Sequence, residues 1–122
     1  ELKHENMLIV YDDVNLDFGV LRMRPSGTDG GQNGMKSIIY EMNTDTVPRL
    51  RIGIRNEIEL QKAGNESGFT LADYVLSGFT DAELENMDKV MNVSQAAILS
   101  FMDDGIAEAM NRFNKDHLLS AE

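Results

Sequence analysis

Residues 19–39 read Gly19-Val-Leu-Arg-Met-Arg-Pro-Ser-Gly-Thr-Asp-Gly-Gly-Gln-Asn-Gly-Met-Lys-Ser-Ile-Ile39. The first six residues place Leu21 and Met23 on one face and two arginines on the other, which predicts a half-exposed strand. A segment with four glycines in ten residues follows, and apolar residues then recur at helical spacing from Met35 onward. The stretch therefore predicts a strand, a glycine-rich loop and a helix that begins at this loop.

The neighbouring segments continue this alternation of strands and helices. Met7-Leu-Ile-Val-Tyr11 is a continuous apolar run that ends at Asp12 and Asp13, which predicts a strand buried on both faces. Residues 50–54 alternate and predict another strand. Residues 56–70 predict a long loop, and residues 72–76 predict a short strand or a helical turn.

Two helices are expected near the end of the chain. Thr80 and Glu83 form the pattern of a capping box, and Gly105 ends the helix that follows. A last helix is expected to carry Ile106, Ala109, Met110 and Phe113. The longer helix is expected to pack through a stripe of Leu84, Met87, Met91, Ser94, Ile98 and Phe101. Strands interleaved with helices predict one α/β domain over residues 1–122, with a mixed, twisted sheet flanked by helices.

The composition excludes several classes of protein. The chain has 122 residues and no cysteine, so it contains no disulfides and no thiolate metal sites. No apolar run approaches the ~20 residues of a membrane span, and nothing resembles a signal peptide. We therefore expect a cytoplasmic protein without a membrane partner.

Charge is distributed unevenly along the chain. The net charge of −10 argues against nonspecific binding of nucleic acid. Residues 20–56, however, hold six basic against three acidic residues, whereas residues 57–111 hold two basic against eleven acidic residues. One part of the molecule could face phosphate while the other repels it, or the charges could form an ordinary solvated surface.

Three features could form a site. Asp12 and Asp13 could orient a histidine or bind a metal, but Asp is also common in turns and caps, and no further ligand stands at metal spacing. The glycine-rich segment suits an anion or a carbonyl oxygen, although a structural turn would need the same glycines. His4 and His117 lie near the chain ends and are expected to be solvated. We expect neither a metal nor a cofactor.

Five segments, taken in order, resemble the bacterial-type peptidyl-tRNA hydrolase family. They are spread over nearly the whole chain, at residues 8–19, 21–39, 48–54, 72–76 and 109–114. The resemblance implies a single α/β domain that hydrolyses the ester between a peptide and the terminal ribose of tRNA, which recycles tRNA from abandoned translation. The expected partner is peptidyl-tRNA, bound at its acceptor stem and 3′ end.

The resemblance also implies roles for individual residues. In the family a histidine near the chain start activates water, and the carboxylate matching Asp12 orients this histidine. Asn33 matches an asparagine that contacts peptidyl-tRNA, and Gln32 is expected to bind substrate beside it. The family usually has histidine in place of Gln32, which can form hydrogen bonds but cannot carry a proton. The basic residues expected to contact the tRNA backbone are Arg24, Lys36 and Arg51.

The family carries a further segment ahead of the stretch that matches Met7, which includes its first strands and its catalytic histidine. We therefore expect this chain to be the C-terminal two-thirds of such an enzyme and to be inactive alone. The parent enzyme is expected to be a monomer, whereas the sheet edge left open in the fragment would favour self-association.

Two other functions are compatible with the sequence. A noncatalytic RNA-binding relative would keep the fold and the basic residues, and a catalytic histidine encoded upstream would argue against it. A structural or interaction domain would use the acidic helix of residues 80–104, and binding to the acceptor stem of tRNA would argue against that function.

Overall fold

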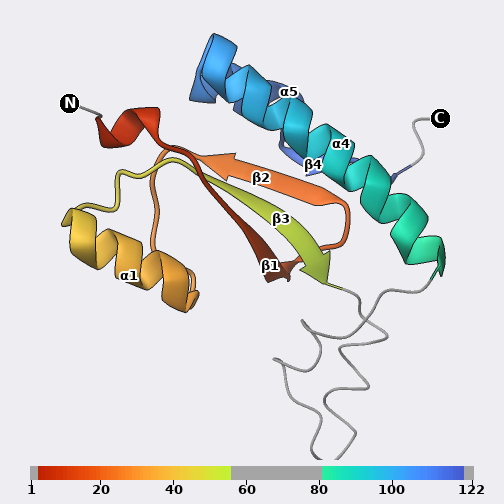
Figure 1. The fold of residues 1–122 in the computed structure, drawn as a ribbon, viewed down its shortest axis with the longest axis horizontal. Helices are drawn as coiled ribbons and strands as arrows, with labels where there is room; N and C mark the ends of the chain where they lie inside the picture. The colour runs from red at the N-terminus through yellow and green to blue at the C-terminus, as the bar shows by residue number, and fades with distance from the viewer. Residues whose placement is uncertain (1–2, 56–80, 120–122) are drawn as a thin grey trace, which may run out of the picture.

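The computed structural model describes residues 3–55 and 81–119 (Figure 1). Its elements, in chain order, are η1 (His4–Asn6), β1 (Ile9–Asp17), β2 (Val20–Arg24), α1 (Asn33–Met42), β3 (Arg49–Arg55), α4 (Asp81–Asp104), α5 (Ile106–Phe113) and β4 (Lys115–Asp116). The predictions for residues 56–70, for residues 72–76 and for the capping box lie outside the described residues. None of the helices described is long and apolar enough to cross a membrane.

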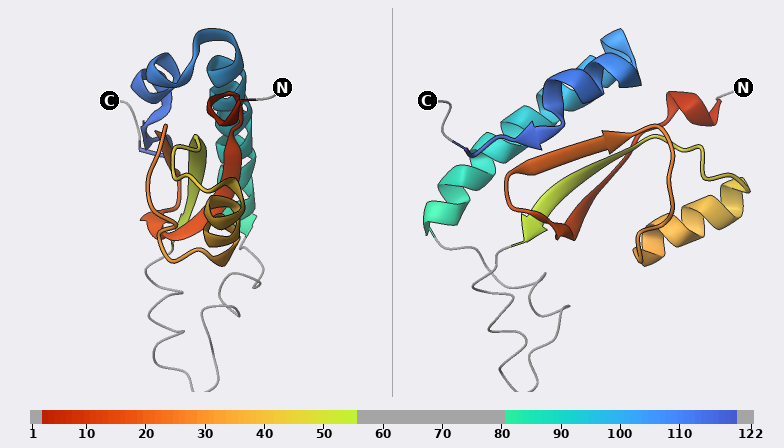
Figure 2. Two further views of the ribbon diagram at one scale, coloured as in Figure 1. Left: turned by 90° about the vertical axis from the view of Figure 1, so that its left-hand side faces the viewer. Right: turned by 180° about the vertical axis from the view of Figure 1, so that it is seen from behind.

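The four strands form one mixed sheet in the order β1-β3-β2-β4. β1 and β3 run parallel, with Ile9 opposite Arg49 and Asp13 opposite Gly53. β2 is antiparallel to β3, and the short β4 is antiparallel to β2. The sheet lies between α1 and the pair formed by α4 and α5 (Figures 1 and 2). The predicted α/β fold with a mixed sheet flanked by helices is confirmed.

One face of the sheet is apolar and packs against α4 and α5. The buried members of this core are Leu21, Met23, Leu50, Ala97 and Ala109. Alternation along β2 directs Arg22 and Arg24 to the other face, where both are exposed. The sequence prediction for β2 as a half-exposed strand is therefore confirmed.

The irregular part of β1 lies so close to β3 that position 53 has to be glycine. Between Asp13 and Asp17 the register shifts, because β1 advances four residues while β3 advances two. A Cβ atom on Gly53 would overlap the backbone oxygen of Asp17 and would lie 2.9 Å from the Cβ of Leu16. Any side chain at this position would therefore force the bulged part of β1 away from the sheet.

Asn114 fastens the end of α5 to β2. Its Oδ1 accepts a hydrogen bond from the backbone N–H of Met23 at 2.6 Å, and its Nδ2 donates to the carbonyl of Met23 at 3.0 Å. The carboxamide thus pairs with β2 as the peptide group of a neighbouring strand would. β4 continues this pairing, with Lys115 opposite Leu21.

The sequence prediction for the first strand was wrong in its extent and burial. β1 runs from Ile9 to Asp17, so Asp12 and Asp13 lie within the strand and do not end it. Val10 is 42% exposed. The reason is position, since β1 is the outer strand of the described sheet and the helices pack mainly over β2 and β3.

The predicted apolar stripe of the long helix was also partly wrong. Leu84 and Met91 are exposed, whereas Val90, Ser94 and Ala97 are buried. Small residues let α4 approach its neighbours closely, so the face that packs is rotated from the one marked by the largest apolar side chains. As predicted, the long helix ends before Gly105. This residue has a φ of 88°, which favours glycine.

Candidate functional site

Five arginines lie on the face of the sheet opposite α4 and α5, which we call the arginine face. They are Arg22, Arg24, Arg49, Arg51 and Arg55. Arg22 of β2 stands directly opposite Arg51 of β3, and Arg24 stands opposite Arg49. Among the described residues, Arg22 and Arg24 have no hydrogen-bond or ion-pair partner. Like charges directly opposite each other destabilise a sheet, so this face is suited to an anionic ligand.

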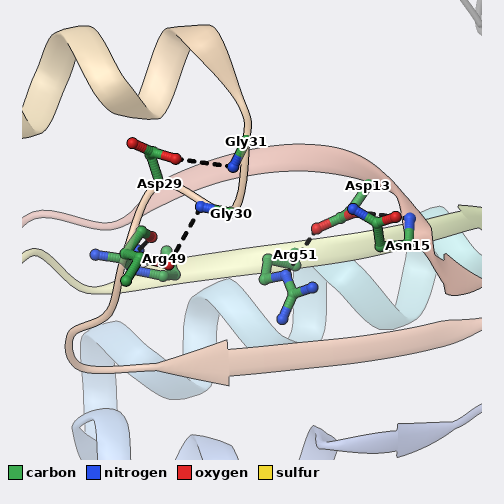
Figure 3. A network of polar contacts seen from close by, with 8 residues as sticks. Asp13, Asn15, Asp29, Gly30, Gly31, Arg49 and Arg51 are labelled. Carbon is green, nitrogen blue, oxygen red and sulfur yellow. Dashed lines mark hydrogen bonds and ion pairs between the residues drawn. The ribbon is translucent and has the colours of Figure 1, made fainter.

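Asp12 and Asp13 point to opposite faces of β1 and have different surroundings. Asp13 is 9% exposed, and its Oδ2 lies 2.8 Å from the Nε of Arg51 (Figure 3). Its Oδ1 accepts a hydrogen bond from the N–H of Asn15 at 2.7 Å. Asp12 is exposed and has no partner among the described residues. Asp13 therefore holds the Arg51 side chain, whereas Asp12 is available to a further group.

The glycine-rich loop (residues 25–32) brings two amide side chains to the N-terminus of α1. Gln32 is the N-cap, and its Oε1 accepts hydrogen bonds from the N–H groups of Gly34 and Met35, at 2.9 and 3.2 Å. Asn33 is exposed, and so is Lys36 in the first turn. Neither of these two side chains has a partner in the described part of the chain. Because capping occupies the oxygen of Gln32, only its Nε2 can donate to a ligand.

No pattern in the sequence indicated the role of Arg49, which was predicted only as one of the basic residues of the region 20–56. Arg49 is 3% exposed, and its guanidinium donates to three backbone carbonyls, including that of Thr28 in the glycine-rich loop. The position of Arg22 opposite Arg51 was missed as well. The alternation of β2 could have suggested its face, but the pairing depends on the register between strands.

The predicted site residues lie in three places. Arg24 and Arg51 lie on the arginine face; Gln32, Asn33 and Lys36 lie at the start of α1; and Asp12 lies on the other face of β1. Ile9 pairs with Arg49, which contacts the glycine-rich loop. Asp12 is three residues further along β1, so its backbone lies roughly 10 Å from that of Ile9. Within residues 3–55 and 81–119, no hydrogen bond or ion pair joins Asp12 to the other two groups.

The described residues contain no assembled metal centre and no histidine paired with a carboxylate. No group of three potential ligands among His, Cys, Asp and Glu comes together in this part of the chain. The Nε2 of His117 lies 2.8 Å from the carbonyl oxygen of Phe113. Neither His117 nor His4 is hydrogen-bonded to a described carboxylate.

The fold and the site define an α/β domain with exposed cations on one face of its sheet and a capped helix N-terminus after its glycine-rich loop. The chain belongs to the peptidyl-tRNA hydrolase family, whose model matches residues 1–120. A peptidyl-tRNA hydrolase of Clostridium botulinum is 39% identical over 114 residues, which are 93% of this chain and 55% of the relative. Another, of Chlorobaculum parvum, is 41% identical over 115 residues, which are 94% of this chain and 57% of the relative.

Solved structures agree with this assignment. A crystal structure of peptidyl-tRNA hydrolase in complex with N-propanol matches with a TM-score of 0.71 and 25% identity, over 92% of this chain and 53% of that one. The enzyme of Acinetobacter baumannii matches with a TM-score of 0.70 and 25% identity, over 90% of this chain and 52% of that one. The chain thus spans about half the length of the relatives that it matches.

Proposed function

We propose that these residues form part of an enzyme that hydrolyses the ester bond between the peptide and the tRNA of peptidyl-tRNA. Membership of the family supports this reaction. The observation that carries the proposal is the exposed carboxylate of Asp12, which lies within a strand and has no partner among the described residues. A carboxylate in such a position can accept a hydrogen bond from an imidazole and keep it basic.

In the proposed reaction, a histidine takes a proton from water while the water oxygen bonds to the ester carbonyl carbon. The bond to the ribose oxygen then breaks, and the histidine returns the proton to this oxygen. Asp12 holds the histidine in the required tautomer and orientation. The histidine is assigned to the segment that the family carries ahead of the residues matching Met7. The amide of Asn33 is assigned to the peptidyl end of the substrate, and Gln32 contributes through its Nε2.

Three members of the arginine face, Arg22, Arg24 and Arg51, are assigned together with Lys36 to the tRNA acceptor stem and 3′ end. Arg24 and Lys36 are exposed cations without described partners, and Arg51 is held by Asp13 through its Nε alone. The two terminal nitrogens of Arg51 are therefore available to phosphate oxygens. Arg22 joins this set because it stands opposite Arg51. A phosphate between these two arginines would relieve their mutual repulsion.

Catalysis is tested in a full-length form, by which we mean a chain as long as the curated relatives. The measured quantity is the release of an N-blocked amino acid from N-blocked aminoacyl-tRNA. We expect Asp12→Ala to lower kcat by about 100-fold or more, and Gln32→Ala to lower it far less. Equal losses for both variants would contradict the assigned roles. The 122 residues alone are expected to release nothing, and release abolished by His4→Ala or His117→Ala would overturn that expectation.

RNA binding is tested through its dependence on salt. We expect Arg22→Ala, Arg24→Ala and Arg51→Ala each to weaken tRNA binding and to reduce the slope of log K against log salt by about 0.7 to 0.9. The matched control is Arg112→Ala, because Arg112 is an exposed arginine of α5 that pairs with Asp104 and Glu108. If the slope changed equally in the control, the arginine face would not be the binding surface.

The alternative is a noncatalytic RNA-binding relative with the same fold. The observation that favours it is that neither described histidine is hydrogen-bonded to a described carboxylate. A full-length form that binds tRNA through the arginine face but releases no amino acid would establish this alternative.

A further inference from the structure

Arg49 is a buried cation whose described partners are all neutral. It is 3% exposed. Its Nε donates to the carbonyl of Val47 at 3.1 Å, its Nη1 to that of Thr28 at 2.6 Å, and its Nη2 to that of Asp45 at 3.1 Å. Removing a guanidinium from water is costly, so these three hydrogen bonds have to offset a large desolvation term. A buried cation held in this way is a fixed part of the structure and is not exposed to solvent or to a ligand.

The three carbonyls lie on two segments that are separated by α1 in the sequence. Thr28 belongs to the glycine-rich loop, whereas Asp45 and Val47 belong to the connection from α1 to β3. The backbone reinforces the same junction, because the N–H of Gly27 donates to the carbonyl of Asp45 at 3.2 Å. Arg49 therefore ties the start of the loop to the connection that leads into β3.

A continuous series of short-range bonds leads from this junction to Asn33. Asp29 follows Thr28, and its Oδ1 accepts from the N–H of Gly31 at 2.8 Å. Its carbonyl accepts from the N–H of Gln32 at 3.0 Å. Gln32 in turn caps α1, in which Asn33 is the first residue. The loop that leads to Asn33 is thus held near its start by Arg49, through the carbonyl of Thr28.

We propose that Arg49 is a positioning residue for the amide side chains of Gln32 and Asn33, acting through the carbonyl of Thr28. The proposal rests on the function proposed above, in which Asn33 binds the peptidyl end of the substrate. A direct contact of Arg49 with phosphate does not fit, because its guanidinium is buried and each of its three nitrogens is already bonded. Arg49 differs in this respect from Arg22 and Arg24, which are exposed.

The first test measures the mobility of the loop in the full-length form by backbone ¹⁵N relaxation. In Arg49→Met we expect order parameters at Thr28 and Gly31 to fall from about 0.85 to below about 0.6, while those of β2 stay unchanged. Arg49→Lys keeps the charge but replaces the planar guanidinium with a single ammonium group, which cannot reach all three carbonyls. This variant is measured instead if Arg49→Met does not fold. Unchanged order parameters in a folded variant would overturn the proposal. The matched control is Arg112→Met.

The second test separates positioning from general stability. We expect Arg49→Lys to lower kcat/KM for N-blocked aminoacyl-tRNA by about 10- to 100-fold. In an Asn33→Ala background the same substitution should cost less than about 3-fold, because Arg49 acts through Asn33. Equal losses in both backgrounds would overturn the proposal. If the unsubstituted full-length form hydrolyses nothing, the proposed function fails, whereas the relaxation measurement still decides whether Arg49 holds the loop.

Discussion

Replacing Asn114 with aspartate removes one hydrogen-bond donor and leaves the shape of the side chain unchanged. In the protein, Nδ2 of Asn114 donates to the carbonyl of Met23 at 3.0 Å, while Oδ1 accepts from the N–H of Met23 at 2.6 Å. In Asn114→Asp a carboxylate oxygen faces this carbonyl. One hydrogen bond is therefore replaced by repulsion between two acceptors, at the point where α5 is attached to the sheet.

The expected loss in the free energy of unfolding is about 2 to 4 kcal/mol at pH 7. A hydrogen bond contributes about 0.5 to 1.5 kcal/mol, and a buried acceptor left unpaired costs about 1 to 3 kcal/mol. Met23 is completely buried, so water does not readily replace the lost donor. For a domain of this size, the loss corresponds to a decrease in Tm on the order of 10 °C.

Acidification should reverse part of this loss, because a protonated carboxyl can again donate to the Met23 carbonyl. Burial beside an acceptor raises the pKa of the introduced carboxyl in the folded state above its unfolded value of about 4. This part of the destabilisation is therefore absent below about pH 4, and it grows as the pH rises from there through the folded-state pKa.

The assay is urea denaturation of the 122-residue chain followed by circular dichroism, at pH 7 and at pH 3.5. The control is Asn111→Asp, because Asn111 is exposed on the same helix and the substitution adds the same charge. We expect the control to change stability by less than about 0.5 kcal/mol. Equal losses in the two variants, or a loss in Asn114→Asp that does not depend on pH, would refute the reasoning.

Two further predictions concern the contact of Gly53 with β1 and the capping of α1 by Gln32. Gly53→Ala should destabilise the fold by about 2 to 4 kcal/mol or prevent folding, because the added methyl group overlaps the Asp17 backbone oxygen. A loss below about 1 kcal/mol in urea denaturation would contradict this close contact between β1 and β3. Gln32→Ala should cost about 1 kcal/mol by removing the acceptor for Gly34 and Met35, and Gln32→Asn should retain most of that stability. Thermal denaturation that ranks the two variants in the opposite order would argue against the cap.

Local patterns in the sequence were sufficient to place several elements. The alternation from Val20 to Arg24 predicted both the strand and its apolar side, because successive side chains of a strand point to opposite faces whatever the rest of the chain does. The glycine-rich segment predicted a loop before α1, and Gly105 predicted the break between α4 and α5. These signals depend on residues within a few positions of one another. The resemblance in five ordered segments predicted the family in the same way, without knowledge of any contact.

The burial of the first strand depended on its neighbours. A run of apolar residues shows that β1 can be covered, but its place at the outside of the described sheet leaves Val10 exposed. The same uncertainty applied to the aspartates, since only the pairing with β3 shows that Asp13 meets Arg51 and that Asp12 does not. The residues expected to be catalytic and RNA-binding could thus be named in advance, but their separation onto two faces of the sheet could not.

The sequence by itself determined the order of the longer described strands and helices along the chain, the family, and the presence of a locally basic region, but it gave no sign of the short β4. Only the tertiary structure decided that Arg49 is buried against the glycine-rich loop, that Arg22 stands opposite Arg51, and that Asn114 completes the edge of β2. Each of these features joins residues that are distant in the chain. The period of a strand or a helix fixes which residues share a face, whereas register and packing between elements decide what that face meets.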